Sequence, residues 1–186
     1  LPSMVMMDVR EIKTMPAFVE ADVFRAIQHL PGVQTLNDFS SALYVRGSTP
    51  DQNLIMLDGI TVYNPFHLGG VFSTFNTDAI KEANFHAGGF SARYGGRMGS
   101  ILNIINREGN TEEFMGKANI SLISSKALME GPLHINDQLT GSWMLAGRRT
   151  YFDKVADVVM YFAKKNNDEI DADEIPDHVF PYYFYD

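Results

Sequence analysis

The stretch Gln52-Asn53-Leu54-Ile55-Met56-Leu57-Asp58-Gly59 decides how the first half of the chain folds. Its central residues, 54–57, are apolar at every position, which predicts a strand that is covered on both faces. Asp58-Gly59 is a dipeptide that favours a two-residue hairpin turn. Residues 60–63 are therefore expected to return as the second strand of a hairpin.

Short elements on either side of this hairpin predict a small α+β domain. Residues 4–9, 42–45 and 101–105 are apolar runs that indicate strands. From Phe18 to Leu30, apolar residues recur with helical spacing, which predicts one amphipathic helix of about three to four turns. Four polar residues are expected on its solvent face: Glu20, Asp22, Arg25 and Gln28.

Glycines are concentrated between residues 88 and 99. A loop that binds phosphate would carry G-x-G-x-x-G, or a lysine followed by serine or threonine after the glycines, and neither pattern is present. We therefore interpret these glycines as tight turns between strands.

Arg46 directly follows the apolar residues 42–45, so its guanidinium is expected to lie half buried at the end of a strand. A buried guanidinium needs a carboxylate or several carbonyl oxygens as partners. That partner need not belong to this chain.

From residue 114 the polarity of the sequence alternates with a period of two. Ala127, Met129, Leu133 and Ile135 share one parity, and Lys126, Glu130, His134 and Asn136 share the other. Such alternation is typical of transmembrane β-strands. It is also typical of a half-buried sheet in a soluble domain, and periodicity alone favours this second interpretation.

The connections in this second part differ in length. Short ones are expected at Ser124-Ser125 and at residues 136–138, and a long acidic one at 151–179. Pro132 is expected near a strand end, because proline has no N–H to donate to a neighbouring strand.

Composition excludes several classes of function. A net charge of −8 argues against a nucleic-acid partner, and the absence of cysteine excludes thiol catalysis and disulfides. The longest apolar run, 158–163, is far shorter than the ~20 residues of a membrane-spanning helix. No zinc-protease or G-x-S-x-G motif occurs, so we do not expect an enzyme or a cofactor.

The acidic run 168–177 contains the only candidate metal ligands. Asp168, Asp171 and Asp173 form a weak candidate for Ca²⁺, which prefers oxygen ligands in a flexible loop. The run lacks the glycine and glutamate spacing of an EF-hand, and a solvated loop is the favoured interpretation.

Five segments in fixed order resemble the plug domain of TonB-dependent outer-membrane receptors. They are LYVRG at 43–47, QNLIMLDG at 52–59, IKE at 80–82, GGFSARYGG at 88–96 and LNII at 102–105. The resemblance covers roughly residues 10–108, and GRRTY at 147–151 is similar to receptors of the Bacteroidetes type.

The resemblance implies a fold and a division of the chain. It implies a small mixed sheet with short helices, followed by the first antiparallel strands of a transmembrane β-barrel. Residues 1–110 would form the plug, and residues 111–186 the first three or four strands with an acidic extracellular loop at 151–179. Since a plugged barrel has about 22 strands, 186 residues are expected to be one domain plus the opening of a second.

The implied function is energy-coupled uptake through the bacterial outer membrane. TonB would pull on a segment upstream of the plug, and the ligand would be an iron–siderophore, haem, cobalamin, a glycan or a peptide. The alternative that we carry is a soluble plug-like signalling or adhesion module without transport.

The resemblance also implies roles for individual residues. Ligand contacts are expected in the loops at 63–70 and 88–96, at Tyr63, Phe66, His67, Phe90, Arg93 and Tyr94. Arg46 matches the plug arginine that pairs with the barrel wall. Ala87 stands where the family often has a second basic residue, which Arg93 or Arg97 is expected to replace; of the two, Arg97 is the residue that we assign to this pairing.

Overall fold

The computed structural model describes residues 4–16, 20–37, 40–67, 70–121, 123–135, 138–151 and 154. The chain divides into two compact units, Leu1–Gly109 and Asn110–Asp186, which are described separately below.

The first unit contains short helices and strands around one mixed sheet. Its elements are β1 (Met4–Asp8), α1 (Val9–Thr14), α2 (Val23–Gln28), β2 (Val33–Gln34), β3 (Tyr44–Val45), the 3₁₀ turn η1 (Pro50–Gln52), β4 (Leu54–Leu57), β5 (Ile60–Thr61), β6 (Phe66–His67), β7 (Phe72–Ser73), β8 (Ile80–His86) and β9 (Ile101–Asn106). The sheet has the order β1-β8-β9-β4-β5. Only β4 and β9 run parallel; the other neighbours are antiparallel.

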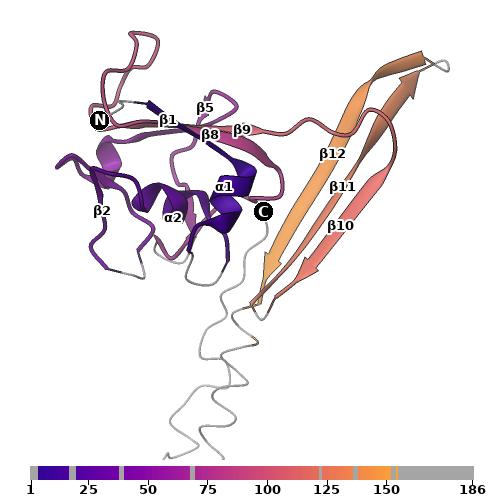
Figure 1. Cartoon of the computed structure of the whole chain (residues 1–186), viewed down its shortest axis with the longest axis horizontal. Coiled ribbons are helices and arrows are strands. Elements are labelled where there is room, and N and C mark those ends of the chain that lie inside the picture. The colour runs from indigo at the N-terminus through magenta and orange to yellow at the C-terminus, as the bar shows by residue number, and fades with distance from the viewer. Residues whose placement is uncertain are drawn as a thin grey trace, which may run out of the picture. The chain divides into compact units, whose positions relative to one another are not determined.

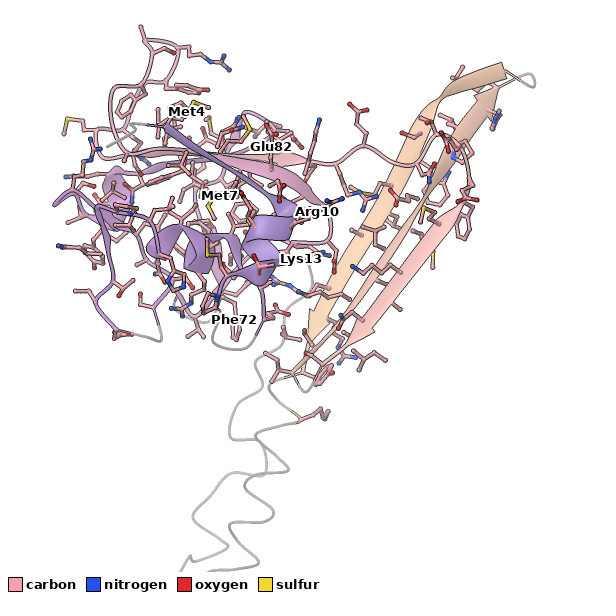
Figure 2. All side chains as sticks on the ribbon, in the orientation of Figure 1. Met4, Met7, Arg10, Lys13, Phe72 and Glu82 are labelled. Carbon is pink, nitrogen blue, oxygen red and sulfur yellow. The ribbon has the colours of Figure 1, made fainter. Side chains whose placement is uncertain are left out.

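The helices cover one face of this sheet (Figure 1). Ile12 of α1 and Phe24 of α2 pack with Phe85 and Leu102 from the two central strands, all of them 2% exposed or less. Met7 of β1 points to the same side, as Figure 2 shows. This interface is the main core of the unit, because it removes large aromatic and aliphatic side chains from water.

The predicted hairpin at the centre of the sequence is confirmed. Leu57 pairs with Ile60, which leaves Asp58 and Gly59 as a two-residue turn with φ of 50° and 82°. The carboxylate of Asp58 accepts hydrogen bonds from the backbone N and side-chain Nδ2 of Asn106, each at 2.9 Å. The turn is thereby fixed to the end of β9.

Strand β4 is covered on both faces, as its uninterrupted apolar run predicts. Ile55 belongs to the main core beneath the helices. Leu54 and Met56 point the other way and form a smaller cluster with Ile101. Loop residues Phe90 and Tyr94, half buried, pack on this second cluster.

The predicted helix over 18–30 is wrong in length and in its solvent face. Within the described residues α2 spans six residues, because the side chain of Asp22 caps it. Asp22 Oδ1 accepts from the backbone N of Phe24 at 2.8 Å, and its Oδ2 accepts from the backbone N of Ser73 at 2.9 Å. Arg25 is also buried and donates to the carbonyl of Ser40 at 3.0 Å. Both charges are therefore structural rather than solvent-facing.

The sequence does not predict helix α1; it predicts a first strand that extends to residue 9. Asp8 and Glu11 form a capping box, with Asp8 Oδ1 accepting from the backbone N of Glu11 at 2.9 Å. Near the other end, Lys13 Nζ lies 2.6 Å from Asp78 Oδ1. Figure 2 labels Arg10 and Lys13 on this helix.

The second unit is a three-stranded antiparallel sheet. Its strands β10 (Met115–Ile120), β11 (Ser124–Ile135) and β12 (Gln138–Thr150) lie side by side in that order. The connection between β10 and β11 falls at residues 121–123, so the predicted turn at Ser124-Ser125 is wrong. Ser121 Oγ and the Ser124 carbonyl, 3.1 Å apart, hydrogen-bond across this connection.

The prediction that Pro132 lies near a strand end is wrong, because Pro132 lies inside β11. The pairing explains this position, because β10 pairs only with residues 125–130 of β11. At Pro132, which faces Ser142 on β12, the described sheet has a neighbour on one side alone. A residue without an N–H fits such a position.

The alternation of polarity is confirmed up to a bulge between Leu133 and His134. Burial in the second unit is inverted relative to a soluble sheet. The apolar parity is exposed, with Leu145 66% exposed, whereas Glu130 and Arg148 on the other face are 2% and 3% exposed. An apolar face turned outward suits lipid rather than water.

Candidate functional site

Three connecting segments gather at one end of the first unit's sheet, which we call the loop end. Ile101 at the start of β9 pairs with both Leu54, the first residue of β4, and His86, the last residue of β8. Segments 46–53 and 87–100 therefore meet there. Segment 62–65 joins them, because β5 runs antiparallel to β4 and the backbone N of Val62 donates to the Ile55 carbonyl at 2.9 Å.

Polar contacts tie two of these segments together. Asn53 Nδ2 donates to the Leu43 carbonyl at 2.8 Å, and Asn53 Oδ1 accepts from Ser100 Oγ at 2.9 Å. The backbone N of Gly99 donates to the Gln52 carbonyl at 2.9 Å. A Cβ at position 99 would stand 2.5 Å from Ser48 Oγ, so only glycine allows this approach.

Arg46 stands in the centre of a tight turn at the loop end. Its φ is 51° and that of Gly47 is 86°, and the backbone N of Ser48 donates to the Val45 carbonyl at 2.9 Å. The side chain is exposed, so the prediction of a half-buried guanidinium is wrong. The turn carries Arg46 beyond the buried end of β3. Among the described residues Arg46 has no ion-pair partner.

A cleft of about 220 Å³ opens at the loop end. Tyr63, which is 86% exposed, and Arg97 lie on its wall together with Asp51. The remaining lining residues are Pro50, Asn53, Ile55, Thr61, Val62, Asn64, Pro65 and Phe66. The cleft thus offers an aromatic surface, a guanidinium and a carboxylate, which are groups that recognise polar ligands of either charge.

A second group of candidates forms a stack that is not part of the cleft lining. The guanidinium carbon of Arg93 lies 4.8 Å from the centre of the Tyr94 ring. The Tyr94 ring is tilted against His86 with 6.0 Å between ring centres. Arg93 is exposed, whereas Phe90 and Tyr94 are half buried against the smaller apolar cluster.

The structure separates the eight predicted site residues by their surroundings. Tyr63, Phe66 and Arg97 share the cleft, but Phe66 also packs on Phe24 with ring centres 4.8 Å apart. His67 lies half buried on β6, where it pairs with Phe72. Phe66 therefore contributes to the core as well as to the cleft.

Sequence reasoning missed Asp51, Asn53 and His86. The polar run 50–53 was visible between two strands, but its meeting with residues 97–100 depends on the parallel pairing of β4 with β9. A long-range parallel pairing has no local signal in the sequence.

The calcium candidates Asp168, Asp171 and Asp173 lie outside the described residues, as does nearly all of the predicted loop 151–179. Among the residues that the structure describes, no group of three or more His, Asp or Glu side chains is placed to hold a metal ion. No helix in that part of the chain has the length and apolarity to cross a membrane.

Residues 6–100 match the sequence profile of the TonB-dependent Receptor Plug Domain. The chain belongs to this family. The match ends next to Ile101, so it contains all three segments of the loop end and the cleft between them. The matched residues lie within the first unit, and the family resides in the bacterial outer membrane.

Solved structures agree with the fold at low sequence identity. The outer membrane transporter YddB from Escherichia coli aligns with a TM-score of 0.57 and 11% identity, over 80% of this chain and 26% of that chain. A copper transporter, OprC, aligns with a TM-score of 0.56 and 13% identity, over 81% of this chain and 24% of that chain. No curated protein matches the sequence.

The chain thus spans about a quarter of the length of these transporters. The aligned share of this chain, about 149 residues, exceeds the 109 residues of the first unit, so the fold likeness extends into the second unit.

Proposed function

We propose that this chain supplies the plug and the first barrel strands of a receptor for TonB-driven uptake. Residues 1–110 form the plug and residues 111–186 open the barrel wall, with residues 151–179 as an extracellular loop. TonB acts on a segment upstream of the plug, and the loop end meets the ligand. The receptor acts as a transporter, not as an enzyme.

The cleft at the loop end is the observation that supports ligand contact. It is open, and it combines the exposed ring of Tyr63 with Asp51 and Arg97. The stack of Arg93 on Tyr94 adds a second exposed cation in segment 87–100, outside the cleft lining. A ligand with anionic or hydroxyl groups and an apolar body is the class that suits these groups. Phe90 and His67 support the segments on which these residues lie.

The inverted burial of the second unit supports the barrel part of the proposal. Strands β11 and β12 have 12 and 13 residues, which is enough for a tilted strand to cross a bilayer. The exposed apolar parity would face lipid, and the parity of Glu130 and Arg148 would face the lumen.

Arg46 and Arg97 are proposed to pair with carboxylates of the barrel wall. Both side chains are exposed at the loop end, and Arg97 makes only a hydrogen bond to the Gly96 carbonyl, at 3.2 Å, among the contacts described for it. Such polar contacts would hold the plug without an apolar seal, which is what a movable plug requires.

Uptake measurements on the full receptor that contains this chain test the proposal. Cells that express the receptor are given a panel of labelled iron–siderophores, haem, cobalamin, glycans and peptides, with and without functional TonB. We expect one class to accumulate only in the TonB-containing cells. Uptake that is independent of TonB for every class, or no uptake, would favour the soluble signalling or adhesion module.

Variants of the cleft then locate the binding site. Tyr63→Ala and Arg97→Ala are expected to weaken binding of that ligand roughly tenfold or more, since each removes a side chain that lines the cleft. Arg10→Ala is the matched control, because Arg10 is an exposed arginine on α1 (Figure 2) and does not line the cleft. Equal affinities in all three variants would remove the ligand site from the cleft.

A further inference from the structure

The cleft at the loop end receives one exposed polar side chain from each of its three segments. Asp51 comes from segment 46–53, Tyr63 from segment 62–65 and Arg97 from segment 87–100. Parts of the chain that are far apart in sequence therefore present a carboxylate, a phenol ring and a guanidinium to one space of about 220 Å³.

The two charges in this lining do not neutralise each other. Within the part of the chain that the structure describes, no ion pair joins Asp51 to Arg97, and the Asp51 carboxylate accepts no hydrogen bond. Arg97 donates from Nη1 to the neighbouring Gly96 carbonyl, at 3.2 Å, and a guanidinium has five N–H groups in all. The carboxylate can therefore accept, and the guanidinium can donate, toward a bound molecule.

The backbone holds the two charged residues in place on either side of the cleft's polar contacts. Gln52, the residue after Asp51, accepts a hydrogen bond through its carbonyl from the backbone N of Gly99, two residues after Arg97, at 2.9 Å. Pro50 opens the 3₁₀ turn that carries Asp51, and its ring fixes φ there. Groups that are already held in place lose little conformational freedom when a ligand binds.

The charges and the size of the cleft together restrict its ligand. An ion of one sign would be attracted by one of the two charged side chains and repelled by the other. A molecule that carries both signs satisfies the two side chains at once. The volume lies below the range of pockets for drug-sized ligands, about 300–1,000 Å³, so the bound unit is small.

We propose that the cleft binds a short zwitterionic peptide, with its ammonium at Asp51, its carboxylate at Arg97 and its apolar part against the ring of Tyr63. This inference rests on the proposed function, because it requires that the loop end meets the ligand. Hydrogen bonds between two charged groups are about twice as strong as neutral ones, which favours a peptide with free ends over the hydroxyl groups of a glycan.

Four tripeptide libraries with randomised side chains test this proposal, because they differ only in their ends. One has both ends free, one is N-acetylated, one is C-amidated and one carries both blocks. Each library is passed over the immobilised full receptor in detergent, and the retained peptides are quantified by mass spectrometry. We expect the receptor to retain the free library roughly tenfold more strongly than either singly blocked library, since each block removes one charge-assisted contact.

Charge-reversal variants assign each end to its residue. Arg97→Glu makes the cleft acidic and should move the preference to the C-amidated, cationic library. Asp51→Lys makes the cleft basic and should move it to the N-acetylated, anionic library. Arg10→Glu and Glu108→Lys are the matched controls, because both residues are exposed and neither lines the cleft, so the wild-type preference should remain.

The outcomes separate this inference from the proposed function. Equal retention of the four libraries, no retention of any, or a wild-type preference that survives both charge reversals in the cleft would overturn the peptide inference. TonB-dependent uptake of haem, cobalamin or another class would then still support the transporter. A preference for free peptides without TonB-dependent uptake of any class would instead overturn the transporter and leave a peptide-binding module.

Discussion

The guanidinium of Arg46 lies against the backbone of Gly88, so closely that a Cβ at position 88 would stand 3.0 Å from Nη1. The same side chain passes Gly32, where a Cβ would stand 3.7 Å from Cγ. Two glycines from distant segments thus leave room for one arginine. The contact fixes the orientation of the exposed Arg46 side chain, which we propose pairs with a carboxylate of the barrel wall.

Replacement of Gly88 by alanine should destabilise the plug and displace Arg46. Gly88 has a φ of 155°, where a side chain is strained, and the added Cβ would crowd Nη1. We expect a loss of about 1–3 kcal/mol in the free energy of unfolding, measured by urea titration of the full chain.

A double-mutant cycle isolates the arginine contact from the backbone strain. Gly88→Ala should cost less in an Arg46→Ala background, because the crowding disappears while the strain remains. Gly70→Ala is the matched control, since Gly70 has a φ of 102° and its Cβ would stand 3.9 Å from Ser40 Oγ, an ordinary contact distance. An identical cost of Gly88→Ala in both backgrounds would contradict the contact.

Gly99→Ala should loosen the loop end. The new Cβ would stand 2.5 Å from Ser48 Oγ and 2.7 Å from Asn53 Oδ1, so the hydrogen bonds that join segments 46–53 and 87–100 must shift. We expect faster amide hydrogen exchange in both segments, and a destabilisation of roughly 1–3 kcal/mol. Gly95→Ala, with nothing within 4 Å of its Cβ, should leave exchange unchanged. Equal exchange in the two variants would argue against the proposed tie.

Asp22 is expected to be the most sensitive acidic residue of the plug. Asp22→Ala removes the cap of α2 and leaves the backbone N of Ser73 without its acceptor, a loss of about 2–4 kcal/mol in unfolding free energy. Asp22→Asn keeps one capping oxygen and should lose less. Asp51→Ala is the exposed control and should change the free energy of unfolding by less than about 0.5 kcal/mol. Comparable losses for Asp22→Ala and Asp51→Ala would contradict the capping role.

Replacement of the two aromatic residues of the cleft should have different effects on the free energy of unfolding. Phe66 packs on Phe24 in the core, and its replacement by alanine should lower the free energy of unfolding by about 2 kcal/mol. Tyr63 is almost fully exposed, so Tyr63→Ala should leave the melting temperature nearly unchanged and affect only ligand binding. A large loss of stability in Tyr63→Ala would show that this ring is structural.

Sequence patterns correctly predict the elements that depend only on neighbouring residues. The turn at Asp58-Gly59, the strand over Leu54–Leu57 and the alternation around Met129 follow from two or more adjacent residues, and the structure has them. The charges of Asp22 and Arg25 predict solvent exposure, but both side chains are buried because backbone groups serve as their hydrogen-bond partners. The missing N–H of Pro132 predicts a strand end, because the residues around the proline do not show how far β10 extends along β11.

The cleft was predictable in part. The family resemblance predicts functional roles for Tyr63 and Arg97, but nothing in the sequence indicates that they line one cleft with Asp51. That arrangement depends on the order β8-β9-β4-β5, in which strands far apart in sequence become neighbours. The sequence also does not predict that Arg46 is exposed. Its exposure depends on a turn in which Arg46 has a positive φ, and residue type alone does not predict a positive φ at an arginine.

Accessibility along β12 tests the central claim most directly, that the second unit opens a barrel around the lumen of an outer-membrane receptor. The chain has no cysteine, so Trp143, Met144, Leu145 and Ala146 can be replaced by cysteine one at a time and spin-labelled in the full receptor in outer membranes. We predict that labels at 143 and 145 collide with oxygen dissolved in the lipid, and that labels at 144 and 146 collide less with it. Equal collision rates at all four positions, or the reverse alternation, would contradict the account.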